Sequence, residues 1–296
     1  MLGRSPLLRG IEMKLAPILI LVLLSAHPAA GDDRPLFGPG IKPPWEGTPV
    51  VFDHDQAEQL WRTLAYGYFG ERPIVEGDGG IRLEAPSRAE DDAMVPVSIS
   101  TVLKEPVKRI YLVVDVNPIP MGGVFTVSEN RSIETISTRV RVNGFTYVRA
   151  VAETVSGKLY MDKRMVKSRG AACAAPPITD PEQAKANLGK MRFKQMSARG
   201  GDELDAILLH INHPNATGLQ KDQVSLLYIP EHYVKEILVT FNDELILKAE
   251  TSYTISENPT FRFNFMPQEE GELKAQMTDT KGNVFSMTSQ IKPTTR

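Results

Sequence analysis

Residues 95–102 read VPVSISTV, and residues 109–116 read RIYLVVDV. Apolar and polar side chains alternate along both runs, which is the period-two pattern of a strand with one face against a core. Pro106 separates the runs and Asn117-Pro118 follows them, and proline and asparagine favour turns. The region therefore predicts two neighbouring β-strands joined by a short turn.

Similar runs extend this pattern on both sides. They lie at residues 81–85, 123–128, 134–142, 145–154 and 158–167. Two of the joints, Asn143-Gly144 and Ser156-Gly157, suit tight hairpin turns. Seven short strands separated by turn residues predict an immunoglobulin-like sandwich over residues 51–168.

A second series of strand patterns occupies the C-terminal part of the chain. It comprises residues 190–197, 202–212, 234–242, 244–251, 260–266, 272–278 and 283–291. The residues 279–283, DTKGN, fit a hairpin turn. We therefore predict an all-β fold class with two immunoglobulin-like β-sandwich domains in tandem, the second over residues 189–296. Because the linker is short, we expect the two halves to pack as one unit.

Two helices are expected outside the strands. Residues 55–66 place apolar side chains at helical spacing, and Gly67 follows as a stop. Between the two strand series, residues 179–182 read TDPE and offer an N-cap, a proline at the first helical position and a capping glutamate. We expect one N-terminal helix on the first sandwich and a linker helix that ends near residue 188.

The beginning of the chain has the pattern of a signal peptide. Residues 15–26 read LAPILILVLLSA, with basic residues before them and small residues after them. This run is shorter than the roughly 20 residues that span a bilayer. We expect residues 1–31 to be removed as a signal peptide and residues 32–50 to form an extended, proline-rich leader. The mature protein is then expected in the periplasm without stable membrane insertion.

Composition and motifs argue against several function classes. The chain is 42% hydrophobic with a net charge of -2, which is typical of a globular protein without a basic field for nucleic acid. It lacks the GxSxG, HExxH, GxxxxGKS/T and CxxC motifs. His210 and His213 are three apart on a predicted strand, so they point to opposite faces, and His54 and His232 are distant in sequence. We therefore expect no catalytic activity, no metal site and no cofactor.

Cys173 is the single cysteine, so no internal disulfide can form. Its flanks are Gly170, Ala171, Ala172, Ala174 and Ala175. Such small neighbours give a slim segment that fits a partner's channel, whereas a core cysteine is normally flanked by a periodic apolar pattern. The cations just upstream are Lys163, Arg164, Lys167 and Arg169. Because cations favour the thiolate, we expect an accessible, thiolate-prone cysteine on an arm and linker at residues 169–188. The alternative is a cysteine tucked between the domains.

Several short segments carry a resemblance to known proteins. In the first half they are IRLEAPSRAE at residues 81–90, VPV at 95–97, Asn117-Pro118, TRVRV at 138–142 and VRAVAET at 148–154. In this order, and followed by a cysteine arm, they resemble SoxY, the periplasmic carrier subunit of sulfur oxidation. In the second half they are INHPNATG at residues 211–218, Asn258-Pro259 and TDTKG at 278–282. These look like SoxZ.

The resemblance implies a fold and a role. SoxY and SoxZ are immunoglobulin-like subunits of a heterodimer, and the SoxY cysteine carries sulfur intermediates between separate enzymes without catalysing a step itself. Carried over to this chain, Cys173 is the covalent attachment point. The run GKLYM at residues 157–161 is most similar to a fused SoxY-SoxZ carrier associated with quinoprotein dehydrogenases. The family arm reads GGCGG at the chain end, whereas this chain has AACAA inside it.

We therefore expect a periplasmic carrier that holds a small anionic sulfur compound, or another small group, on Cys173. Its expected partners are periplasmic sulfur-oxidation or quinoprotein dehydrogenase enzymes, and not nucleic acid. A second hypothesis is a non-catalytic accessory module for a quinoprotein dehydrogenase, in which Cys173 is incidental. A third hypothesis, a copper or other metal carrier, is opposed by the poor spacing of the ligands.

Overall fold

The computed structural model describes residues 54–128, 133–196, 206–265 and 267–293. The chain divides into two compact units, Met1–Pro35 and Leu36–Arg296, and all described residues lie in the second unit. The expected signal peptide and leader, residues 1–50, lie outside the described residues. In the part that is described, no helix is both long and apolar enough to cross a membrane.

The described chain is built mainly from β-strands. The first half contributes β1 (Ile74–Glu76), β2 (Ile81–Glu84), β3 (Val95–Thr101), β4 (Val107–Val114), β5 (Met121–Val127), β6 (Thr135–Val140), β7 (Thr146–Thr154) and β8 (Leu159–Val166). The second half contributes β9 (Met191–Met196), β10 (Ala206–Ile211), β11 (Val234–Phe241), β12 (Glu244–Thr251), β13 (Thr260–Asn264), β14 (Gly271–Asp279) and β15 (Val284–Ile291). The helix α1 (His54–Phe69) precedes the strands, and α2 (Pro181–Asn187) links the halves. The predicted all-β fold class, with an N-terminal helix and a linker helix, is confirmed.

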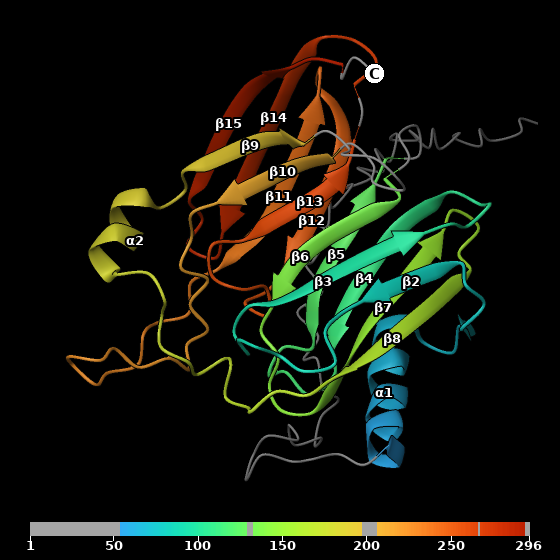
Figure 1. The fold of residues 1–296 in the computed structure, drawn as a ribbon, viewed down its shortest axis with the longest axis horizontal. Coiled ribbons are helices and arrows are strands. Elements are labelled where there is room, and N and C mark those ends of the chain that lie inside the picture. Colours follow the sequence, from blue (N-terminus) through green and yellow to red (C-terminus); the bar gives the residue numbers. More distant parts are fainter. Residues whose placement is uncertain (1–53, 129–132, 197–205, 266, 294–296) are drawn as a thin grey trace, which may run out of the picture. The chain divides into compact units, whose positions relative to one another are not determined.

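Two sheets run through both halves (Figure 1). The larger sheet has the order β1-β8-β7-β4-β5-β12-β11-β14-β15, and the smaller has the order β2-β3-β6-β13-β10-β9. The halves meet where β5 pairs antiparallel with β12 and where β6 pairs antiparallel with β13. These pairings satisfy backbone groups that an isolated half would leave open at a sheet edge. The halves therefore form one unit that is joined through main-chain hydrogen bonds.

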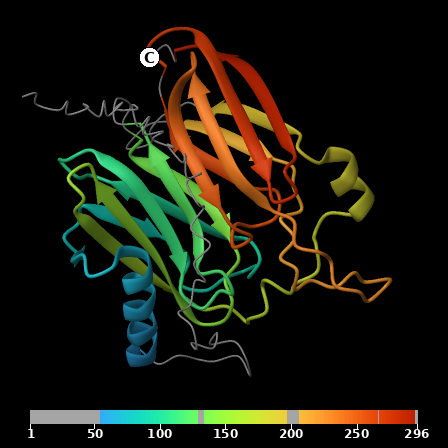
Figure 2. The same cartoon turned by 180° about the vertical axis from the view of Figure 1, so that it is seen from behind.

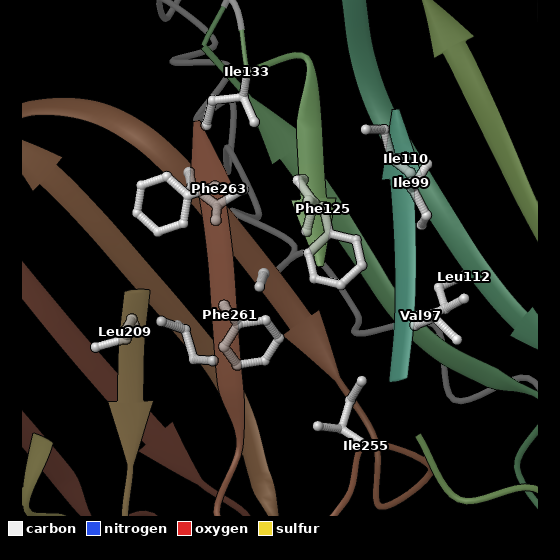
Figure 3. Packing of buried hydrophobic residues seen from close by; sticks show 14 of the residues in the cluster. Val97, Ile99, Ile110, Leu112, Phe125, Ile133, Leu209, Ile255, Phe261 and Phe263 are labelled. Atoms are coloured by element: carbon white, nitrogen blue, oxygen red, sulfur yellow. The ribbon is translucent and has the colours of Figure 1, made fainter. Parts of the chain in front are cut away.

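The hydrophobic core continues across the junction between the halves (Figure 3). Phe125 of β5 and Phe261 of β13 meet edge to face, with ring centroids 6.1 Å apart. Val97, Ile99 and Ile255 belong to the same buried cluster. Full burial of an aliphatic or phenylalanine side chain stabilises a fold by about 1.5–3 kcal/mol. The core thus stabilises each half and also the junction between the two halves.

The helix α1 covers one face of the larger sheet (Figures 1 and 2, blue). Its residues Trp61 and Leu64 pack with Val113 of β4 and Val151 of β7. Arg149 of β7 is buried and donates through Nη2 to Glu58 Oε1 at 3.0 Å. Apolar packing and this ion pair therefore anchor the helix to the first half.

The helix and the turns follow the predictions with two exceptions. The helix α1 continues through the expected stop at Gly67 and ends at Phe69. Gly70, with a φ of 65°, donates its N–H to the carbonyl of Tyr66 and ends the helix there. The predicted hairpin at Asn143-Gly144 is wrong, because these residues connect β6 of the smaller sheet to β7 of the larger one. Just after β6, Arg141 N already bonds to Thr254 O outside the strand ladder, so the chain is leaving the sheet.

The other two predicted turns are confirmed. The Ser156-Gly157 turn joins the antiparallel strands β7 and β8, and Gly157 has a φ of 86°. The turn at 279–283 joins β14 and β15. There Asp279 Oδ1 accepts hydrogen bonds from the N–H groups of Lys281 and Asn283, both at 2.9 Å.

Candidate functional site

Cys173 lies on the connection between β8 and α2. Ala174 N donates to Ala171 O at 2.9 Å, which closes a tight turn around Ala172 and Cys173. Ala171 has a φ of 62°, a conformation that glycine adopts freely but that costs another residue about 1–2 kcal/mol. Cys173 is 0% exposed. The expectation of an accessible cysteine is therefore wrong for this conformation, because the arm is folded onto the protein.

Three side chains hold this turn by its backbone, and we call them the seat. Asn143 Oδ1 accepts a hydrogen bond from Cys173 N at 3.0 Å. Thr217 Oγ1 donates to Cys173 O at 2.6 Å, and Gln220 Nε2 donates to Ala175 O at 2.8 Å. Each bond of this kind contributes about 1 kcal/mol, so a local motion is enough to release the turn from these side chains. Asn143 comes from the first half, whereas Thr217 and Gln220 come from the second.

The ends of the arm are fixed by other contacts. On the first side, Ser168 Oγ donates to Val142 O at 2.7 Å. On the second side, Glu257 accepts from the N–H groups of Ile178 and Thr179 at 2.8 and 2.9 Å. Arg169 N also donates to Asp92 Oδ2 at 2.9 Å. Residues 170–177, which we call the arm, can therefore leave the seat while both ends stay in place.

The helix after the arm begins as predicted. Asp180 is the N-cap of α2, where its Oδ1 accepts from the N–H groups of Glu182 and Gln183 at 3.0 and 3.1 Å. Within the arm, Ala172 is buried, Gly170 and Ala175 are half-buried, and Ala171 and Ala174 are exposed. The small flanks thus include two exposed side chains that do not hold the arm down.

The electrostatics of the docked thiol differ from the expectation. Burial raises the pKa of Cys173 to about 12, and the positive charge that opposes this shift is that of Arg141. Lys167 and Arg169, expected to favour the thiolate, are exposed just before the arm, where water screens their charge. Lys163 is paired with Glu58 and Glu76. The prediction of a thiolate-prone cysteine is therefore wrong while the arm is docked.

Arg141 is a residue that the sequence analysis missed. It lies just after β6 and is 2% exposed. Its Nη1 donates to the carbonyl oxygens of Tyr253 and Ile255 at 2.6 and 2.7 Å. The only local signal was its alternation with valine in the TRVRV run, because its burial is set by the loop around Tyr253, which lies far along the chain.

A second buried polar cluster joins His213, His232 and Asp279. His232 Nε2 lies 2.8 Å from Asp279 Oδ2, and His213 Nε2 lies 3.6 Å from the same oxygen. The two imidazole rings meet edge to face with centroids 4.5 Å apart. His210, in contrast, lies half-buried on β10 and is not part of the cluster. Sequence spacing suggested that His232 was isolated, but the fold brings it next to His213.

The three side chains are of the types that bind Zn²⁺, but the hydrogen bonds around them indicate a proton, and not a metal ion, between His213 and Asp279. Asn215 N donates to His213 Nδ1 at 3.1 Å, so a neutral His213 carries its proton on Nε2, the atom that faces Asp279. A metal-binding histidine normally has the opposite arrangement, with the free nitrogen toward the metal and an N–H on the other side. We therefore interpret the cluster as a structural network close to the seat, since Asn215 and Thr217 lie two and four residues after His213.

Comparisons with known proteins agree with the two-part organisation. The family model for sulfur oxidation protein SoxY matches residues 66–173, and that for sulphur oxidation protein SoxZ matches residues 191–290. The solved structure of the sulfur carrier protein SoxY from Chlorobium limicola f thiosulfatophilum is 28% identical, with coverage of 38% of this chain and 93% of its own, and a TM-score of 0.32. A superoxide reductase (neelaredoxin) from Ignicoccus hospitalis is 14% identical, with coverage of 32% and 95% and a TM-score of 0.27. Among curated proteins, none matches the chain.

Proposed function

Because a SoxY domain and a SoxZ domain follow each other in this chain, it belongs to the sulfur-oxidation carrier family as a fused SoxY-SoxZ protein, and we propose that it carries a sulfur compound covalently on Cys173 and presents it to partner enzymes in the periplasm. The observation that carries this proposal is the way the arm is held. The three seat bonds go to the backbone of residues 173 and 175, so release of the arm need not disturb the sheets. The hydrophobic run at residues 15–26 supports export.

Release of the arm gives the thiol the reach and the reactivity that a carrier needs. Between the fixed residues Arg169 and Ile178 the chain has a contour of roughly 30 Å, so Cys173 can move out by roughly half that length. Once in water, the thiol regains a pKa near 8.5 and supplies thiolate at neutral pH. Attachment of thiosulfate would form a sulfur–sulfur bond and release one proton and two electrons. The partner sulfur-oxidation enzyme accepts these electrons.

A surface beside the seat supports contact with partner enzymes. The segment 219–228 projects from the second half between β10 and β11 (Figure 1, orange). Its exposed large apolar side chains are Leu219, Val224, Leu226, Leu227 and Tyr228. Asp222 Oδ1 orders the tip by accepting from Val224 N and Ser225 N. Ordered, exposed apolar side chains of this kind are typical of protein-binding surfaces, and Gln220 links the base of this segment to the arm.

The second candidate function is a non-catalytic accessory module for a quinoprotein dehydrogenase with an incidental cysteine. The observation that favours it is the complete burial of Cys173. The two functions differ in whether the thiol is ever modified in the native protein.

Intact mass spectrometry of protein isolated from its native source tests the carrier function. We expect the mature chain to begin near residue 31 and to carry an added mass on Cys173 that a reductant removes. The Cys173→Ala variant, isolated in the same way, is the control and should lack the added mass. If wild-type protein from cells oxidising a sulfur compound has a bare thiol throughout, the accessory function is favoured instead.

The seat can be weakened without touching the cysteine. In the Thr217→Val/Gln220→Leu variant two hydrogen bonds to the arm are lost, at about 1 kcal/mol each, so the open fraction should rise roughly 30-fold. We expect Cys173 to react with iodoacetamide faster by the same factor. Thr251→Val is the matched control, because Thr251 Oγ1 donates to Val234 O at 2.5 Å, away from the arm. Equal rates in the seat variant and the control would show that these contacts do not govern access to Cys173.

A further inference from the structure

Arg141 is a buried cation without an acidic partner among the described residues. Its side-chain bonds within the described chain go to carbonyl oxygens and not to a carboxylate, and its Nε has no hydrogen-bond partner. Removal of a guanidinium from water is costly unless an anion compensates for it, and the carbonyl oxygens of Tyr253 and Ile255 compensate only in part. The site therefore has an unused capacity to bind a negative charge.

Arg141 lies close to the seat. Arg141 is two residues before Asn143, which binds Cys173 N, and next to Val142, which binds Ser168 at the start of the arm. Arg141 lies near enough for its charge to act on the Cys173 thiol. Glu257 also acts on Arg141, but its two carboxylate oxygens already bind backbone N–H groups at the end of the arm.

The outer side of the arm has the opposite charge. An open hollow of about 520 Å³ is lined by Ala172 and Ala175 of the arm, by the acidic run Glu90, Asp91 and Asp92, and by one cation, Arg169, so acidic side chains predominate there. An anionic group on Cys173 would be repelled from this hollow and attracted toward Arg141.

We propose that Arg141 is the counter-ion for a sulfur oxyanion carried on Cys173, so that the loaded arm returns to the seat and its cargo is sheltered there. This inference rests on the proposed carrier function and names the chemical class of its cargo. The seat bonds join the backbone of Cys173 and not its sulfur atom, so we expect them to form again after loading. The Nε–H of Arg141 supplies the donor that an oxyanion accepts.

Two adducts of equal length but different charge test this role in the full chain. Tetrathionate reacts with the Cys173 thiolate at a bridging sulfur, displaces thiosulfate and leaves the anionic group Cys–S–S–SO₃⁻. Methyl methanethiosulfonate reacts in the same way, displaces methanesulfinate and leaves the neutral group Cys–S–S–CH₃. The measured quantity is the rate at which a water-soluble phosphine cleaves each adduct in the folded protein, divided by its rate in the urea-unfolded chain. This ratio gives the protection of the adduct.

In the wild-type protein we expect the anionic adduct to be at least tenfold better protected than the neutral one. The Arg141→Met variant should lose this difference, Arg141→Lys should keep part of it, and Arg139→Met should keep it all. Arg139 is a matched control because it lies two residues earlier, on β6, and bonds to Thr260 instead. If Arg141→Met does not fold, the comparison of the two adducts in the wild type and in Arg141→Lys still tests the proposal.

Equal or weaker protection of the anionic adduct in the wild type would overturn the proposal, as would a difference that persists in Arg141→Met. Both adducts are installed chemically, so the result does not depend on what the native protein carries. A bare thiol in native protein would instead count against the carrier function itself.

Discussion

At pH 8, Cys173 in the folded wild-type protein is expected to react with iodoacetamide on the order of a hundredfold more slowly than a free thiol. Alkylation requires the thiolate. Burial raises the pKa of Cys173 to about 12, whereas that of a free cysteine is about 8.5. The docked thiol therefore supplies very little thiolate and has no surface for the reagent to reach, so reaction waits until the arm opens. Three seat bonds at about 1 kcal/mol each make the open arm the minor state by a factor on the order of a hundred.

The rate is measured by mass spectrometry against glutathione at the same pH and reagent concentration. The Thr217→Val/Gln220→Leu variant provides the internal comparison, because it should lie between the wild type and glutathione. A wild-type rate equal to that of glutathione would mean that the arm is open in solution and that the burial seen here is not its main state.

Acid is expected to destabilise the protein by about 3 kcal/mol through His213 alone. Burial, and then the nearby His232, lower the pKa of His213 to about 4, while the unfolded chain has a histidine pKa near 6.5. The unfolded state thus binds the proton first as the pH falls. The contribution of His213 to stability is complete above pH 6.5, is lost progressively between pH 6.5 and 4, and changes little below that.

Urea unfolding at a series of pH values from 7 to 4 measures this loss. The control is His213→Asn, whose side-chain oxygen can still accept the N–H of Asn215 but which does not titrate. The variant should lose about 3 kcal/mol less than the wild type over this range. If both proteins lose stability in parallel, His213 is not the group that responds to acid.

The strands were predictable from sequence because burial on one face imposes a period of two. In β3, for example, Val95, Val97 and Ile99 point inward and the residues between them point outward. The cap at Asp180 was equally predictable, because an N-cap acts within four residues. The Asn143-Gly144 pair has the residues of a hairpin turn, but tertiary contacts place the two adjoining strands in different sheets.

The state of the candidate site was not predictable in the same way. Burial of Cys173 depends on Thr217 and Gln220, which are more than 40 residues away and have no local pattern that points to the arm. Small flanks suggested exposure, but small side chains also let a turn pack closely. Arg141 and the histidine cluster were missed because their partners come from other strands and loops.

The most direct test of a carrier arm is the urea dependence of Cys173 alkylation under conditions where the protein remains folded. If the arm leaves its seat by local motion, little surface is exposed on opening, so the alkylation rate should change little with urea well below the unfolding midpoint. The seat variant should then react faster at every such concentration. If instead the logarithm of the rate rises with the full slope of global unfolding, the thiol is reached only through the unfolded chain, and Cys173 is a core residue and not a carrier.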